Sequence, residues 1–222
     1  YFKNGDLVEV TAAYSEIIDA SSINVDFSMA DSLFDSGNVS FNLSSGYLIN
    51  LRYVIRNTNT ILDNENMPVY IIVKDLAGNS KTDSLYISLD NTKPSASIIF
   101  PDNNQIFNSP AFTITGSASD IDGRGDISGK QASEISGVFL SIDADTDFDG
   151  IYDICLAENV SVTDKSNTGS GELCFSSWEY NMSSYYNSNI LIKVNSTDNA
   201  GNQSGYIDTT FIIYNSVPNV KI

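Results

Sequence analysis

With 222 residues the chain is long enough for one or two domains, and a hydrophobic content of 41% is enough to build real cores. The 28 acidic residues outnumber the 11 lysines and arginines, so a formal net charge of −17 argues against nucleic acid or anionic membrane as partners. No apolar run approaches the roughly 18 residues of a transmembrane helix, so we expect no direct membrane insertion. The sequence has no histidine and no recognisable nucleophile–base or phosphate-binding motif, so we expect no catalytic residues and no enzyme activity.

Short runs with apolar side chains at every second position follow one another along the whole chain. Such alternation predicts β-strands that bury one face. The runs lie at 8–12, 23–29, 39–41, 51–55, 69–73 and 85–89 in the first half and at 96–100, 112–116, 138–142, 178–180, 190–194 and 207–213 in the second. The separators are rich in Ser, Asn, Asp and Gly, and no long stretch has the 3.6-residue period of a helix. We therefore predict an all-β sandwich.

One five-residue segment occurs twice, each time between two of these runs. It reads Asp75-Leu76-Ala77-Gly78-Asn79 in the first half and Asp198-Asn199-Ala200-Gly201-Asn202 in the second. Asp can accept a hydrogen bond from its own backbone two residues on, and Gly adopts the positive φ that such a turn demands. The segment predicts a β-hairpin turn, and its repetition in the same setting indicates an internal repeat.

The motif Asp-x-Ala-Gly-Asn in a late hairpin, followed by a strand that ends in Asp90-Asn91-Thr92-Lys93-Pro94, resembles the Ig-like repeats of bacterial and archaeal cell-surface proteins. The resemblance covers nearly the whole chain. It implies two tandem Ig-like antiparallel β-sandwich domains and an extracellular or cell-surface location. It implies no single function, because such repeats serve in S-layers, adhesins and filaments and as spacers beside enzymes.

Matching the two copies gives the expected domain boundaries. The early run at 8–12 matches 112–116, and Pro94 matches Pro218. The first domain, 1–93, then lacks an opening strand of its own. The second domain, 94–215, carries an insertion before its late hairpin. The segment 216–222 corresponds to the first strand of a following repeat.

The surplus strand, with Pro218, Val220 and Ile222, leaves two interpretations open. Either the chain is a fragment of a longer tandem array, or this strand acts as a donor that completes the first domain of the next molecule. An unpaired sheet edge invites such strand addition, and head-to-tail repetition would form a filament. The expected partners are therefore further copies or neighbouring repeats of the same protein.

The most specific polar motif lies in the insertion of the second domain, where Asp alternates with other residues before Gly150. So many carboxylates repel one another without a cation, and Gly lets the backbone fold back so that several oxygens converge on a hard ion. We predict a Ca²⁺ site, with a solvated acidic loop as the alternative. The predicted ligands are Asp143, Asp145, Asp147, Asp149, the carbonyl of Ile151, and Asp153.

The same run resembles the calcium loops of dockerins and thrombospondin type 3 repeats. That resemblance implies, in order, the ligands Asp145, Asp147, Asp149 and Asp153. The run departs from the EF-hand pattern because Leu156 stands where a bidentate Glu is needed. Asp143 or Glu158 would have to supply the missing oxygen atoms.

Cys155 and Cys174 are the only cysteines, and both lie in the second half. A disulfide between them would close a loop of about 20 residues, stabilise the fold by roughly 3 kcal/mol and imply an oxidising exterior. We predict this disulfide, with two free buried thiols as the alternative.

Together these patterns predict a non-catalytic, calcium-stabilised structural module of an extracellular protein, such as an S-layer, stalk or filament. Two rivals remain. One is an adhesin module that binds glycan or protein through the insertion at 143–174. The other is an accessory spacer attached to a secreted hydrolase.

Overall fold

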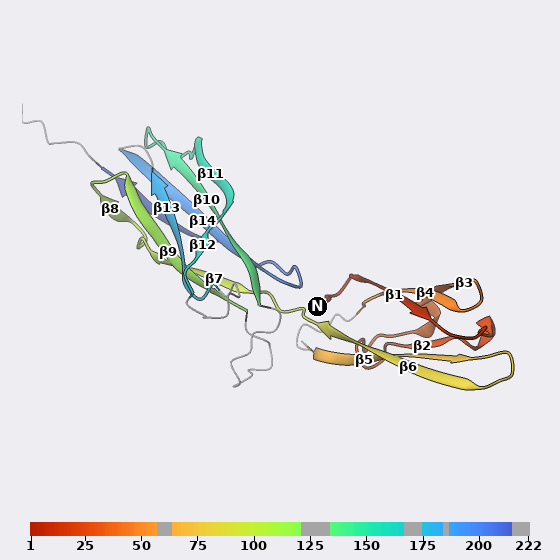
Figure 1. Cartoon of the computed structure of the whole chain (residues 1–222). Helices are drawn as coiled ribbons and strands as arrows, with labels where there is room; N and C mark the ends of the chain where they lie inside the picture. The colour runs from red at the N-terminus through yellow and green to blue at the C-terminus, as the bar shows by residue number, and fades with distance from the viewer. Residues whose placement is uncertain (57–63, 121–133, 167–174, 184–186, 215–222) are drawn as a thin grey trace, which may run out of the picture. The chain divides into compact units, whose positions relative to one another are not determined.

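The computed structural model describes residues 1–56, 64–120, 134–166, 175–183 and 187–214. These residues form two compact units, one spanning Tyr1–Thr92 and the other beginning at Lys93. Each unit is an Ig-like sandwich of two β-sheets, so the prediction of an all-β tandem fold is confirmed (Figure 1). Within the described ranges, no helix is long and apolar enough to cross a membrane.

The first unit consists of two three-stranded sheets and two short 3-10 turns. One sheet has the strand order β1-β4-β3 and the other has the order β2-β5-β6. All of these strand pairs are antiparallel. The elements are β1 (Leu7–Ala13), η1 (Ala20–Ser22), β2 (Asn24–Asp26), η2 (Ser36–Asn38), β3 (Ser40–Ser44), β4 (Leu48–Val54), β5 (Asn64–Lys74) and β6 (Ser80–Leu89).

The second unit has a five-stranded sheet, β11-β10-β14-β15-β8, and a four-stranded sheet, β12-β13-β9-β7. All pairs are antiparallel except β8 with β15, which is parallel. The elements are β7 (Ser95–Phe100), β8 (Gln105–Phe107), β9 (Ala111–Ser119), β10 (Ile135–Asp145), β11 (Ile154–Ser161), β12 (Thr163–Asp164), β13 (Trp178–Ser183), β14 (Ser188–Asp198) and β15 (Ile207–Ile213).

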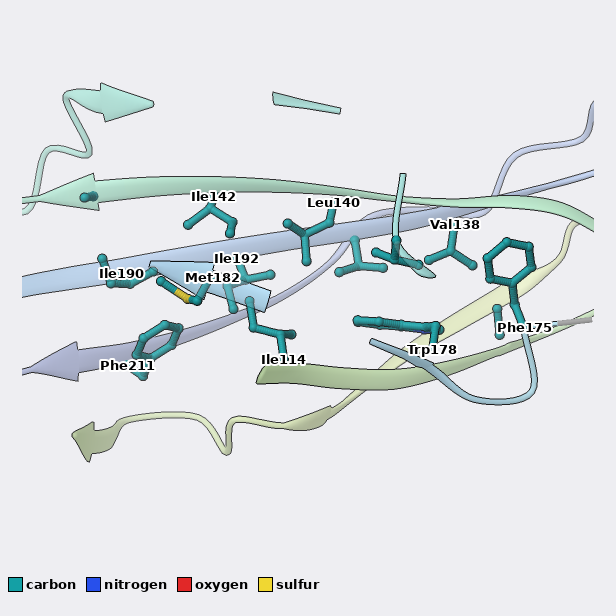
Figure 2. Packing of buried hydrophobic residues seen from close by; sticks show 14 of the residues in the cluster. Ile114, Val138, Leu140, Ile142, Phe175, Trp178, Met182, Ile190, Ile192 and Phe211 are labelled. Atoms are coloured by element: carbon teal, nitrogen blue, oxygen red, sulfur yellow. The ribbon is translucent and has the colours of Figure 1, made fainter. Parts of the chain in front are cut away.

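The apolar positions of the alternating runs form the core of each sandwich. In the first unit Leu51 and Val69 are buried, and Phe27 stacks on Tyr53 with ring centroids 4.4 Å apart. In the second unit the side chains fill the space between the two sheets, with Trp178 lying flat within it (Figure 2). Period-two alternation thus places one face of each strand inside, as predicted.

The repeated five-residue segment forms the same turn in both units. In the first, the backbone N–H of Asn79 donates to Asp75 Oδ1 over 2.8 Å, and its side-chain amide donates to Asp75 Oδ2 over 2.6 Å. In the second, Asn202 makes the same two bonds to Asp198 over 2.8 and 2.9 Å. The glycine before each Asn has a positive φ, 88° and 80°. The predicted bond is present as well, since the backbone N–H of Ala77 donates to Asp75 Oδ1 over 2.8 Å, so the turn prediction is confirmed, and the bonds from Asn are an addition that the structure supplies.

The strand expected over 23–29 is shorter than its sequence pattern suggests. β2 ends at Asp26, and the backbone N–H groups of Ala30 and Asp31 both donate to the carbonyl of Phe27 over 2.8 Å. Met29 lies on this turn and is 55% exposed. A local turn has replaced the last part of the predicted strand, because these hydrogen bonds compete with sheet pairing.

Candidate cation site in the acidic loop

The acidic run predicted as a cation site connects β10 to β11. β10 ends at Asp145, and β11 begins at Ile154. Between them Phe148 and Gly150 have positive φ angles of 61° and 90°. These two left-handed residues turn the chain back on itself, which is the use of Gly that the sequence pattern indicated.

Asp145 organises the loop from its buried end. Its side chain is only 1% exposed. Oδ1 accepts a hydrogen bond from the backbone N–H of Phe148 over 2.7 Å, and Oδ2 accepts one from Gly150 over 3.0 Å. Both carboxylate oxygens therefore fix the loop backbone, and each retains a lone pair that can face a ligand.

Asp147 and Asp149 are exposed and bring their carboxylates to the same place as Asp145. One carboxylate oxygen from each of the three lies within 4.8 Å of the other two. At this separation each ionised pair repels by about 1 to 3 kcal/mol, depending on how well water screens it. A hard divalent cation, which takes oxygen ligands, is the species that this grouping suits.

Two of the other predicted ligands, Asp143 and Asp153, lie outside this group. Asp143 points to the outer surface of the five-stranded sheet, where Lys193 Nζ is 3.8 Å from its Oδ2. Ile151 is 63% exposed, and its N–H donates to Asp149 Oδ1 over 2.8 Å. Asp153 is exposed and is not among the three grouped carboxylates. The structure thus brings together three of the five predicted carboxylates.

Asp143 and Glu158 were the two candidates for a compensating ligand, and both lie elsewhere. They line a shallow depression on the β10, β11 and β14 surface, with a volume of about 570 Å³. Cys155, Lys193 and Tyr206 line the same depression. In this arrangement neither acid adds oxygen atoms to the three-carboxylate group.

Tyr152 is a loop residue that sequence reasoning missed. Its hydroxyl oxygen accepts a hydrogen bond from the Asn189 side-chain amide over 3.0 Å, which ties the loop to β14. Burial and then the charge of Asp145 raise the pKa of the Tyr152 phenol above its ordinary value. The one available signal was that this acidic loop carries two aromatic side chains, Phe148 and Tyr152.

Two further predictions involve residues outside the described ranges. Cys155 is an exposed, free cysteine on β11, and Cys174 lies outside the described residues. The donor residues Pro218, Val220 and Ile222 also lie outside them. Both the disulfide and the donor strand stay predictions.

The disulfide prediction has a direct chemical test. When the protein is secreted into an oxidising medium and alkylated without reduction, we expect neither Cys155 nor Cys174 to carry the alkyl group. The loss of chain entropy in the unfolded state, worth roughly 3 kcal/mol for such a loop, favours the closed form. Mass spectrometry reads the result, with a reduced sample as control, and two alkylated thiols before reduction would contradict it.

Comparison with known proteins gives distant similarities only. No protein-family model and no curated protein matches the chain. Among solved structures, the fibronectin(III)-like modules of Clostridium thermocellum CbhA have 15% identity and a TM-score of 0.43, over 96% of this chain and 88% of that one. The D00-D0 domain of intimin has 12% identity and a TM-score of 0.32, over 95% and 94%. The sialic acid binding region of a Streptococcus sanguinis adhesin has 8% identity and a TM-score of 0.28, over 95% and 74%.

Proposed function

We propose that this protein is a non-catalytic structural module of an extracellular, cell-surface protein, stabilised by calcium. Assemblies of this kind include S-layers, stalks and head-to-tail filaments. The observation that carries the proposal is the grouping of Asp145, Asp147 and Asp149 in a loop that joins two strands of a complete sandwich. Calcium there would cross-link the loop and add to the stability of the fold, because the three carboxylates lie at the end of β10 and in the connection to β11.

The sandwich architecture supports a mechanical role. Each unit has its own buried core, and strands such as β10 and β14 pair over ten and more residues. Paired strands on a packed core form a stiff block. The high negative charge favours solubility and attracts cations from the medium. These features are those expected of a load-bearing surface module.

Calcium is expected to raise the melting temperature of the second unit. Binding to the folded state alone gives about 2.7 kcal/mol at one hundred times Kd, which corresponds to a shift on the order of 5–10 °C. Trp178 is the only tryptophan of the sequence and is buried in the second unit, so its fluorescence reports this transition. Melts of the full chain in millimolar calcium and in EDTA give the measurement.

A double variant, Asp147→Asn with Asp149→Asn, separates calcium binding from loop folding. It leaves the buried Asp145 and its two backbone hydrogen bonds in place. We expect this variant to lose the calcium-dependent shift and to melt no lower than the wild type in EDTA, because charge repulsion is also removed. Asp208→Asn, an exposed acid on β15, should keep the full shift. An equal melt with and without calcium in the wild type would refute the proposal.

A second candidate function is adhesion through the insertion at 143–174. The observation that favours it is the depression of about 570 Å³ beside β11, whose rim includes the 67% exposed ring of Tyr206. Tyrosines are enriched at binding interfaces because the ring is apolar and the hydroxyl group is polar. Retention of the monomeric protein on a glycan column, and loss of that retention in Tyr206→Ala, would favour this role.

A catalytic domain in the same parent gene would favour a third role, that of an accessory spacer attached to a secreted hydrolase.

A further inference from the structure

In the part of the chain that the structure describes, the first unit has no strand at one sheet edge where the second unit carries β7. In the second unit, β7 lies along β9, with Ala96 opposite Ala118 and Ile98 opposite Gly116. In the first unit, β1 is the counterpart of β9. Among the described residues, β1 pairs only with β4 and has no strand on its other side.

The hydrogen bonds of the two strands show that the open edge is the equivalent one. The N–H of Tyr14, just after β1, donates to the carbonyl of Tyr47 over 2.8 Å. The N–H of Ala118, at the matching position of β9, donates to the carbonyl of Phe175 over 2.8 Å. Neighbouring N–H groups on a strand point to opposite edges, so the N–H of Ala13 faces the open side.

Burial differs between the two units at matching positions along these strands. In β9 the inward residues Gly116 and Ala118 are buried beside the paired strand β7. Their counterparts, Ala12 and Tyr14, are only partly buried. The first unit therefore leaves accessible the part of its core that β7 covers in the second.

A groove of about 580 Å³ occupies this position in the first unit. Its walls are the end of β1 on one side and the β5–β6 hairpin on the other. In the second unit, β9 is the counterpart of β1, and the β14–β15 hairpin is the counterpart of the β5–β6 hairpin. In the second unit β7 packs between those elements. Residues lining the groove include Ala13, Tyr14, Ile17, Ile18, Val73 and Asp83.

The chain contains a second segment with the pattern of β7. β7 is preceded by Pro94, five residues after the end of β6 at Leu89. Pro218 likewise comes five residues after the end of β15 at Ile213. After each proline the second and fourth residues are apolar, Ala96 and Ile98 in β7 and Val220 and Ile222 in the later segment.

We propose that the groove beside β1 binds residues 218–222 of a second copy of this chain as an added antiparallel strand. The β7 register then places Val220 opposite Tyr14 and Ile222 opposite Ala12, with both apolar side chains toward the core. The N–H of Ala13 gains a carbonyl partner, and the exposed edge is covered, as in other cases of strand addition. Because the donor follows the second unit and the acceptor is the first, the contact joins copies head to tail.

The strand addition rests on the structural role proposed above, but it can be refuted while that role stands. A module joined to its neighbours only by the covalent chain would keep that role with no strand exchange. The calcium-dependent melt is therefore recorded on the same samples. A calcium-responsive protein that never associates would overturn the strand exchange and leave the structural role standing.

The test compares the association of the full chain with that of two variants. Val220→Asp with Ile222→Asp removes the apolar donor side chains, and Ala13→Pro removes the N–H that faces the open edge while keeping the extended backbone. We expect the mass of the wild type in sedimentation to rise with concentration, and each variant to remain a monomer. Circular dichroism melts verify that both variants are folded.

A peptide of residues 215–222 tests the groove directly. We expect it to bind the Val220→Asp/Ile222→Asp protein, shifting backbone NMR signals of β1, and to bind the Ala13→Pro protein at least about tenfold more weakly. Three results would each overturn the proposal. These are a wild type that stays monomeric, association that survives in the donor variant, and binding by a peptide of residues 94–100 but not by 215–222.

Discussion

Replacing Gly116 by alanine is expected to destabilise the second unit by about 3 kcal/mol or more. A Cβ at this position would overlap the backbone oxygen of Ser97 and Cζ2 of Trp178. Neither neighbour can move freely, because Ser97 belongs to the paired strand β7 and Trp178 is fully buried. The added methyl group must push apart either the strand pair or the core.

Trp178 fluorescence during urea unfolding measures this effect in the second unit alone, since the sequence has no other tryptophan. Gly205→Ala is the matched control, because nothing lies within 4 Å of a Cβ there. We expect the control to change the free energy of unfolding by less than about 0.5 kcal/mol. A Gly116→Ala protein as stable as this control would show that the indole does not pack on the glycine as described.

The first unit tolerates alanine at the matching position for a physical reason. Ala12 stands opposite Ile49, whereas Gly116 stands opposite Trp178. A larger side chain on one strand is matched by a smaller one on its neighbour, so the space between the sheets is filled in both units. The size of the residue at this position follows from its cross-strand partner.

Replacing Asp31 by alanine is expected to destabilise the first unit by about 3 kcal/mol or more. Asp31 is fully buried and accepts three hydrogen bonds. Its Oδ2 accepts from the Tyr53 hydroxyl over 2.7 Å and from the backbone N–H of Arg56 over 2.6 Å, and its Oδ1 accepts from Leu33 N–H over 2.9 Å. Alanine would leave all three donors without their partner.

Two milder variants calibrate this result. Tyr53→Phe removes only one of the three bonds and is expected to cost about 1 kcal/mol. Asp35→Ala removes an exposed Asp whose Oδ1 accepts from Gly37 N–H over 2.9 Å, and about 1 kcal/mol is expected there too. Thermal unfolding followed by circular dichroism gives the values, with an unchanged Trp178 transition showing that the second unit is unaffected. An Asp31→Ala loss no larger than that of Asp35→Ala would contradict the buried network.

Burial also explains the titration of Tyr53. Desolvation first, and then its hydrogen bond to Asp31, raise the pKa of the Tyr53 phenol well above its ordinary value. The phenol is therefore neutral at physiological pH and can serve as a donor to the carboxylate. The residue pair had no signature in the sequence, because the two residues are 22 positions apart and no local pattern links them.

The sequence alone predicted those elements that depend on interactions between residues close together in the chain. Alternating side chains predicted the strands, and Asp, Gly and Asn in Asp75-Leu76-Ala77-Gly78-Asn79 predicted the hairpin turn and the hydrogen bond from Ala77 N–H to Asp75. Alternation also located the acidic loop. The pattern was wrong where a competing local bond prevailed, as at Met29, where the chain turns instead of extending.

The tertiary structure decided which residues meet across strands. It separated Asp143 from Asp145, although they are only two residues apart, because Asp143 projects from the outer surface of β10 and Asp145 is buried at its end. It placed Trp178 opposite Gly116, and within the described residues it gave β1 a strand partner on one edge only, with a groove beside the end of the strand. These outcomes depend on strand register and sheet order, which are set by contacts between distant parts of the chain, so no local pattern could specify them.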